Sequence, residues 1–236
     1  MEYFTQAIVL NKKDSKENDR LFSLYTKNLG KTTGLARGVK KIQSKMAGQL
    51  EPFALLNIKL VTSRGINRIS NVETLNRYVN IISDYQTIKL ANQCLRLVDD
   101  LVKEGSCDLG ILKLLNQILA ILDDPNKQSA QKEFLTRIFS WQILAHLGYR
   151  PELYQCVICR QKIEPVGNRF NFLRGGLICA EEDREEPEIE VSENQIKVLR
   201  LILEQDLEFF IKNRFNSQLT IGVNELMSEF VVAIRC

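Results

Sequence analysis

The chain has 236 residues, of which 44% are hydrophobic and 26% are charged, and its formal net charge at pH 7 is +3. This composition is typical of a folded globular protein and excludes a largely disordered chain. No stretch approaches the roughly 18 apolar residues of a membrane span, and the apolar run near the N-terminus is too short for a signal-peptide core. We therefore expect a cytoplasmic protein that makes no use of a membrane.

Short β-strands are predicted throughout the N-terminal part, because β-branched and aromatic residues lie in short runs between turn signals. Gly34 inside the third strand indicates a β-bulge, a barrel corner or the close approach of another backbone. Five short antiparallel strands predict a closed barrel of the OB type as a domain of residues 1–80. The predicted strands cover residues 3–11, 20–28, 31–39, 52–62 and 66–78.

The predicted barrel is also strongly basic. Seven Lys or Arg residues and no Asp or Glu lie between Arg20 and Leu50. Residues 1–80 carry 14 basic and 6 acidic residues, whereas residues 81–236 carry 18 basic and 23 acidic residues. This asymmetry predicts a nucleic-acid-binding module attached to a part of the chain that does other work.

Four of the basic side chains are candidate phosphate ligands, because they lie on or beside one predicted loop and can reach successive phosphates. They are Arg37, Lys40, Lys41 and Lys45. Four such contacts predict that affinity for single-stranded DNA falls with salt at a log–log slope of about −3, at roughly −0.7 per contact. The alternative is a solvated, mobile surface turn. The aromatic residues of the strands are expected in the barrel core rather than as base-stacking side chains.

After Tyr78 the apolar residues recur at helical spacing, so residues 81–236 are predicted to form a helical domain. Gly148 stands where a C-cap glycine is expected, and Ser192 followed by Gln195 is a capping-box signal. The predicted fold class is therefore α+β, with the barrel first and the helical domain second. Helices are predicted over residues 81–101, 109–122, 128–147, 194–210 and 222–234.

Three of the six cysteines cluster in an irregular loop at about residues 151–187. Cys156 and Cys159 have CxxC spacing, and 19 residues separate Cys159 from Cys179, a distance at which two turns can converge on a tetrahedral zinc ion. Where a fourth cysteine is expected the chain has Glu182, a less common structural ligand. We predict a zinc-ribbon-like loop with a candidate structural Zn²⁺, and the alternative is a vestigial site without metal.

An enzyme, such as a zinc hydrolase, is a weaker alternative. The sequence has no Gly-x-Ser-x-Gly, no phosphate-loop lysine motif and no His-Glu-x-x-His. Its single histidine, His146, is expected at a helix end rather than in a catalytic site. We therefore expect no catalytic residues and no small-molecule substrate.

Several segments, taken in order, make the chain similar to the RecO family of bacterial recombination mediators. They are Gly38-Val-Lys-Lys-Ile-Gln-Ser-Lys45, Leu50-Glu-Pro-Phe53, His146-Leu-Gly-Tyr149 and Gly175-Gly176. The resemblance covers essentially the whole chain, and the ordered combination is more specific than any single motif. Glu182 departs from the full cysteine set of the family, which bears on zinc and not on the rest.

The resemblance implies a protein without a catalytic site that binds single- and double-stranded DNA and anneals complementary strands. It also implies that the protein works with RecR to load RecA onto DNA coated by the single-strand-binding protein SSB. The acidic C-terminal tail of SSB, which ends in an apolar residue, would dock on the helical domain.

Arg137 falls close to the arginine expected to bind this tail, and it stands among apolar residues of its predicted helix. The alternative for this residue is an exposed helix charge. The second candidate function for the whole chain is an RNA-binding adaptor, built from an OB barrel and a zinc ribbon, that does not anneal strands.

Overall fold

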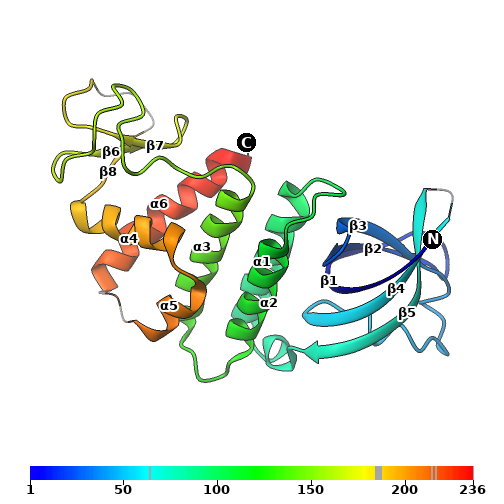
Figure 1. Cartoon of the computed structure of the whole chain (residues 1–236). Helices are drawn as coiled ribbons and strands as arrows, with labels where there is room; N and C mark the ends of the chain where they lie inside the picture. Colours follow the sequence, from blue (N-terminus) through cyan, green and yellow to red (C-terminus); the bar gives the residue numbers. More distant parts are fainter. Residues whose placement is uncertain (64, 184–187, 214, 216, 236) are drawn as a thin grey trace. The chain divides into compact units, whose positions relative to one another are not determined.

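The computed structural model describes all residues except 64, 184–187, 214, 216 and 236 (Figure 1). The chain divides into two compact units, residues 1–132 and residues 133–236. The boundary predicted at residue 80 rests on charge and on the period of the apolar residues, whereas this division rests on packing. The predicted division into a DNA-binding part and a helical part is therefore not tested by it and stays a prediction.

The first unit begins with a closed five-stranded barrel (Figure 1). Its order around the barrel is β1-β2-β3-β5-β4, and β1 pairs antiparallel with β4 to close it. β3 and β5 pair in parallel. This arrangement confirms the predicted OB-type barrel. The strands are β1 (Glu2–Asp14), β2 (Arg20–Thr26), β3 (Gly30–Ala36), β4 (Ala54–Ser63) and β5 (Ile66–Arg77).

The interior of the barrel is filled by the inward-facing apolar residues of all five strands. Phe22, Leu24 and Leu56 are among those at 0–1% exposure, as the alternating pattern of the strands requires. Gly34 allows β3 to approach β5, because a Cβ at this position would lie 2.9 Å from Cγ1 of Ile69. The atoms nearest to this Cβ position belong to the side chains of Ile69 and Leu24, so the glycine makes room for core side chains and not for another backbone.

Two helices follow the barrel within the same unit: η1 (Val79–Ser83) leads into α1 (Tyr85–Leu101), and α2 (Leu109–Asp123) comes next. The side chain of Asp84 caps α1 by accepting from Thr87 N at 2.8 Å. Hydrogen bonds from the Thr87 side chain and backbone hold the pKa of Asp84 below its ordinary value. Asp108 caps α2 in the same way through Gly110 N at 2.7 Å.

The loop between α1 and α2 is hydrogen-bonded to the start of β3. Lys31 N donates to Ser106 O at 3.2 Å, and Gly105 N donates to Lys31 O at 2.8 Å. Gly30 makes this approach possible, because its φ is +62° and a Cβ would lie 1.9 Å from Ser106 O. The helical hairpin and the barrel therefore form one packed body.

Asp99 on α1 adds a polar contact between the hairpin and three strands. Its carboxylate accepts from Asn11 Nδ2 at 3.1 Å and from Ser23 Oγ at 2.6 Å. It also pairs with Lys31 Nζ at 3.3 Å, where both side chains are only 15% exposed. Lys31, one of the seven basic residues of the 20–50 segment, is therefore used inside the unit.

The second unit contains most of α3 (Ser129–His146) and all of α4 (Glu193–Glu204), α5 (Leu207–Lys212) and α6 (Ser217–Arg235). Gly148 ends α3 with φ +92°, and Tyr149 N donates to Leu144 O while Gly148 N donates to Ala145 O. This is the Schellman pattern, so the predicted glycine C-cap is confirmed. The capping box at Ser192 is also confirmed.

The helix predicted over residues 194–210 is in fact two helices. The Nε2 group of Gln142 on α3 donates to the carbonyls of Ile202 and Gln205, which satisfies the end of α4. Asp206 then caps α5 by accepting from Phe209 N at 3.0 Å. A buried side chain from a distant segment thus sets this break, and helical periodicity carries no sign of it. Within the described ranges, every helix is too short or too polar to span a bilayer.

The segment between α3 and α4 folds as a small ribbon on three strands, β6 (Arg169–Asn171), β7 (Gly176–Ile178) and β8 (Glu188–Glu190), in the order β7-β6-β8. Phe170 of β6 is fully buried and lies 6.3 Å from the Trp141 ring of α3 and 5.5 Å from the Phe230 ring of α6, between ring centroids. This aromatic cluster fixes the ribbon on the helices.

Candidate nucleic-acid interface and metal centre

The loop between β3 and β4, residues 37–53, carries the four predicted phosphate ligands. Its apolar side chains anchor it: Val39 and Leu50 are 3% and 1% exposed, and Met46 packs against the same barrel core. The basic side chains between these anchors are exposed. The loop therefore has a buried side and a cationic outer side.

Hydrogen bonds hold the start of this loop against the turn between β1 and β2. The carboxylate of Asp19 accepts from Gly38 N at 2.8 Å. Asn18 O accepts from Lys40 N at 3.1 Å. Gly38 has φ +64°, which an L side chain rarely adopts. The mobile-turn alternative predicts no such contacts between distant segments.

The charges on the loop differ in their partners. Lys40 Nζ lies 2.9 Å from Asp14 Oδ2, and Arg20 Nε lies 2.7 Å from the other oxygen of the same carboxylate. Hydrogen bonds from Arg20 and then Lys40 hold the pKa of Asp14 below its ordinary value. Arg37, Lys41 and Lys45 have no ion pair within 4.0 Å among the residues that the structure describes. These three cations are the ones left for an external anion.

Arg37 and Lys41 also line a shallow open cleft together with Lys16 of the β1–β2 turn. Two carboxylates, Glu17 and Asp19, lie on the same cleft. Asp19 already accepts a hydrogen bond from the loop backbone. The groups of the cleft that do not hold the loop in this way are therefore three cations and the carboxylate of Glu17. The role of these cations in binding stays a prediction.

The aromatic residues considered for base stacking divide into two groups. Phe22, Tyr25 and Phe53 are at most 5% exposed, as expected of core residues. Phe4 is 63% exposed on β1, and the Lys59 ammonium lies 5.3 Å from its ring centroid. Phe4 is therefore an exception to the expected core placement.

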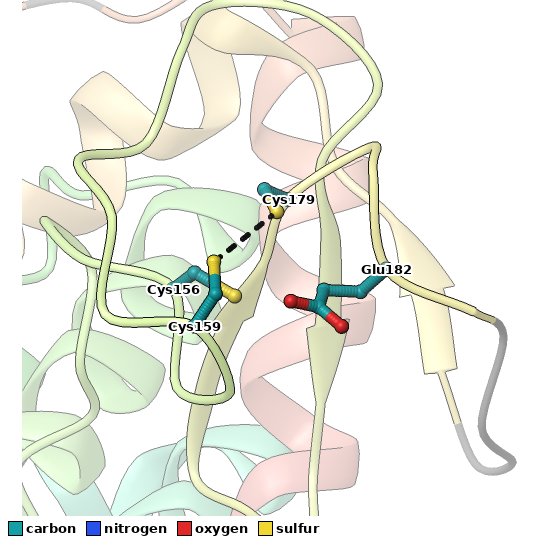
Figure 2. Close-up of side chains that lie close together, drawn as sticks. All are labelled: Cys156, Cys159, Cys179 and Glu182. Atoms are coloured by element: carbon teal, nitrogen blue, oxygen red, sulfur yellow. Dashed lines mark hydrogen bonds between the residues drawn. The ribbon is translucent and has the colours of Figure 1, made fainter.

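The ribbon brings the three clustered cysteines and Glu182 together (Figure 2). Their ligand atoms all lie within 4.8 Å of one another. The Sγ atoms of Cys159 and Cys179 are 3.7 Å apart, whereas a disulfide needs about 2.05 Å. Two thiolates on a tetrahedral zinc at about 2.3 Å each are separated by about 3.8 Å. The spacing therefore matches neighbouring zinc ligands and not a disulfide.

The backbone around the cysteines has the local features that such a turn requires. Arg160 adopts φ +63° directly after Cys159, and its N–H donates to Cys156 O at 3.0 Å. Gly175 has φ +67°, and a Cβ on Gly176 would lie 2.7 Å from the carbonyl oxygen of Glu152. The need for permissive glycines before the second knuckle is confirmed.

Three thiols and a carboxylate lie close together, and a divalent cation would offset the repulsion between their charged forms. Burial raises the pKa of Cys156, but backbone donors from Cys179, Cys159 and Ile158 lower it more. The Gln161 N–H lowers the pKa of Cys159, while burial and the side chains of Cys156, Cys179 and Glu182 raise it, to about 11 overall. Crowding of like donors is unfavourable without a cation, so the residues fit a zinc ion.

Arg169 supports Glu182, the fourth member of this cluster. The residue is buried, and its guanidinium pairs with Glu188 through Nε at 2.8 Å and donates through a terminal nitrogen to Glu182 O at 2.7 Å. The backbone carrying Glu182 is thereby tied to β6 and β8. No local sequence signal indicates this contact, because the three residues come from separate segments.

Arg137 lies on α3, half-buried against α6. One terminal nitrogen donates to Ser228 Oγ, and Nε is buried without a partner among the described residues. Apolar side chains adjoin it on α3, including Phe134 and Ile138, both at most 7% exposed. These buried neighbours hold the arginine in place, and a terminal nitrogen of its guanidinium is the group that could bind a carboxylate. Its function stays a prediction.

The fold and the two clusters define an OB-barrel protein with a helical part that carries a cysteine ribbon. Comparison with known families gives two matches: the family described as Recombination protein O N terminal matches residues 1–78, and Recombination protein O C terminal matches residues 82–231. The chain belongs to the RecO family.

Individual relatives agree with this assignment. A protein of Dehalococcoides mccartyi strain 195, named DNA repair protein RecO, is 32% identical over 234 residues, covering 99% of this chain and 88% of that protein. A protein of the same name from Roseiflexus is 31% identical, covering 87% of this chain and 71% of the relative. Another from Alkaliphilus metalliredigens is 24% identical over 97% of this chain and 92% of the relative.

Proposed function

We propose that this protein is a recombination mediator that binds DNA through the barrel and anneals complementary strands. RecO family membership supports a role in DNA repair and recombination. The cytoplasm, where bacterial DNA is repaired, is the compartment that this proposal implies. The observation that carries the proposal is the loop of residues 37–53, which is hydrogen-bonded to the β1–β2 turn. On it Arg37, Lys41 and Lys45 are exposed and have no ion pair among the described residues.

Annealing follows from electrostatics and needs no catalytic site. Two DNA strands repel each other because each carries closely spaced phosphates. A cationic surface that binds both strands lowers this repulsion and raises their local concentration. The protein then acts by positioning, and base pairing between the strands supplies the driving force. Single- and double-stranded DNA both present the phosphates that such a surface binds.

Partners are proposed for the second unit. The acidic SSB tail would place its terminal carboxylate on Arg137 and its apolar side chain against α3. Binding of SSB would bring the barrel to coated DNA, and RecR would act with the protein in loading RecA. The partly free donors of Arg137 support the first of these steps.

A structural Zn²⁺ is proposed for the ribbon, held by Cys156, Cys159, Cys179 and Glu182. When bound, zinc would join the two knuckles and add binding free energy to the folded state. The chain's own residues prepare the site: Arg169 holds the backbone of Glu182, and the turn at Arg160 directs two cysteines to one side.

A strand-annealing assay tests the central proposal. Complementary oligonucleotides, one coated with SSB, are mixed with the protein in the presence and absence of RecR. We expect faster duplex formation with the protein than without it at low salt, and a loss of this effect as salt rises. Equal rates with and without the protein would reject strand annealing. A clear preference for ribo-oligonucleotides would instead favour the RNA-binding adaptor.

A further inference from the structure

The basic loop has an apolar tip. Ile42 is 105% exposed, the highest value among the described large hydrophobic side chains. An isolated exposed apolar residue is ordinary on a protein surface. Ile42 differs from such residues in its turn position, in the support behind it and in the charges that surround it.

Ile42 stands at a corner of a tight turn. Ser44 N donates to Lys41 O at 2.9 Å, so Lys41–Ser44 is a β-turn with Ile42 and Gln43 at its central positions. Proline is a favoured residue at position i+1 of such turns, so the geometry of the turn does not explain an isoleucine there. The other large apolar residues of the loop, Val39, Met46, Leu50 and Phe53, point toward the barrel core or are buried.

The support for this turn is fixed on both sides. Gly38 and Lys40 are hydrogen-bonded to the β1–β2 turn, and Leu50 N donates to Met46 O at 3.0 Å where the chain returns to the core. The β-branched side chain of Ile42 has few rotamers, so holding it against a ligand costs little conformational entropy. The tip is therefore preorganised.

Cations flank the tip on both sides in sequence. Lys41 precedes Ile42 directly, Lys45 follows three residues later, and both are exposed without an ion pair among the described residues. A polyanion drawn to these charges would bring its own apolar surface to Ile42. In DNA that surface is the face of a base, and isoleucine is among the side chains that proteins insert between base steps.

We propose that Ile42 is an apolar wedge that inserts between neighbouring bases of the DNA strand whose phosphates bind Lys41 and Lys45. This inference rests on the proposed DNA-binding function and adds a contact with the bases to it. The wedge would unstack one base step locally, in a strand held by its backbone. It predicts an affinity component that does not depend on salt.

The test compares Ile42→Ser with Val166→Ser, since Val166 is 81% exposed on the ribbon and serves as a matched surface control. Affinity for a single-stranded oligonucleotide carrying 2-aminopurine is measured over a range of salt concentrations. We expect about a tenfold loss of affinity for Ile42→Ser, because a buried isoleucine contact is lost. The salt slope should stay unchanged, because no phosphate contact is lost.

The wild-type protein should raise 2-aminopurine fluorescence, because a stacked base is quenched, and Ile42→Ser should not. The Val166→Ser variant should behave as the wild type. Unchanged affinity in Ile42→Ser, an altered salt slope, an unaltered fluorescence response or an equal loss in Val166→Ser would each overturn the wedge. Unchanged DNA affinity would leave Ile42 as a protein contact. A wild-type protein that binds no DNA would overturn the proposed function itself, and the wedge with it.

Discussion

At the scale of single residues, the environment of Arg137 differs from that of an ordinary exposed charge on a helix. An exposed charge would present all its donors to water, whereas this guanidinium is half-buried, with one donor on Ser228 and Nε unpaired among the described residues. Burial and the Ser228 contact restrict the guanidinium, so a carboxylate that binds its terminal nitrogens loses less side-chain entropy here than at an exposed site.

We expect Arg137→Ala to weaken binding of an acidic peptide ending in Asp-Phe by about tenfold or more, as loss of a charged hydrogen bond implies. Arg137→Lys should be intermediate, because it keeps the charge but not the planar fork. Fluorescence anisotropy with a labelled peptide measures this. Lys197→Ala, at an exposed position on α4, is the control and should bind as the wild type. Equal affinity of Arg137→Ala and the wild type would dismiss the assignment.

Glu182 is the second informative residue, because it decides whether three thiols are enough for zinc. We expect about one zinc per chain by elemental analysis, and a zinc affinity at least about tenfold lower in Glu182→Ala, as for other losses around zinc sites. Glu182→Cys should bind zinc more tightly, since thiolate is the commoner structural ligand.

Glu181→Ala is the control for this series, since Glu181 is an exposed neighbour outside the ligand cluster. It should bind zinc as the wild type does. Less than about a tenth of an equivalent of zinc in the wild-type protein would contradict a metal-loaded ribbon. The vestigial alternative would then account for the cluster, with the ribbon held by contacts such as those of Phe170 and Arg169.

At the scale of elements, the hydrogen bond between Asp19 of the β1–β2 turn and Gly38 of the basic loop leads to a prediction. The expected effect on DNA binding is opposite to the one that charge alone would give. Asp19 lies beside three cations, so removing its charge should strengthen DNA binding if charge alone matters. Its carboxylate also accepts from Gly38 N, which orders the basic loop. We expect Asp19→Ala to weaken DNA binding by about fivefold, the worth of a typical hydrogen bond.

Asp19→Asn supplies the matched comparison, because the amide oxygen can still accept from Gly38 N while the charge is removed. It should bind DNA at least as tightly as the wild type. Both affinities are measured by anisotropy at one salt concentration. If Asp19→Ala and Asp19→Asn bind equally tightly, then this hydrogen bond does not contribute to DNA binding.

Elements with local signals are the ones that sequence could predict. Alternation, turns and Gly34 predict the barrel, Gly148 and Ser192 predict two helix ends, and the CxxC spacing predicts the knuckle. Each of these signals lies within a few residues of the feature that it indicates. The binding roles of the basic loop residues stay predictions, and what the structure adds to them is their partners within the chain.

The features that sequence could not predict all depend on contacts between distant segments. Gln142 divides a helix some 60 residues away, and Asp99 withdraws Lys31 from the basic patch. The same holds for Asp19, which orders the cationic loop from another turn. Such pairs leave no mark on local periodicity or propensity, because each partner is ordinary in its own segment.

At the scale of the whole molecule, the proposal depends on where charge is placed rather than on how much there is. The formal net charge of +3 is too small to draw DNA to the protein as a whole. Some barrel cations are neutralised within the first unit: Lys31 pairs with Asp99, and Lys40 with Asp14. What remains is local, and a local patch and a diffuse charge can be separated by experiment.

Two charge-matched double variants make that separation. Lys41→Glu with Lys45→Glu, and Lys197→Glu with Lys212→Glu, each lower the formal net charge from +3 to −1. If the loop is the binding patch, the first pair should bind single-stranded DNA far more weakly, with a log–log salt slope shallower by about 1.4 for two lost contacts. The second pair should keep the wild-type slope, because Lys197 and Lys212 are exposed on α4 and α5 of the second unit. Thermal unfolding should differ only modestly between the pairs: all four side chains are exposed, and the ion pairs of Lys197 with Glu193 and of Lys212 with Glu208 are each worth only about 0.5 kcal/mol. Equal losses of DNA affinity would mean that net charge, and not the loop, governs binding.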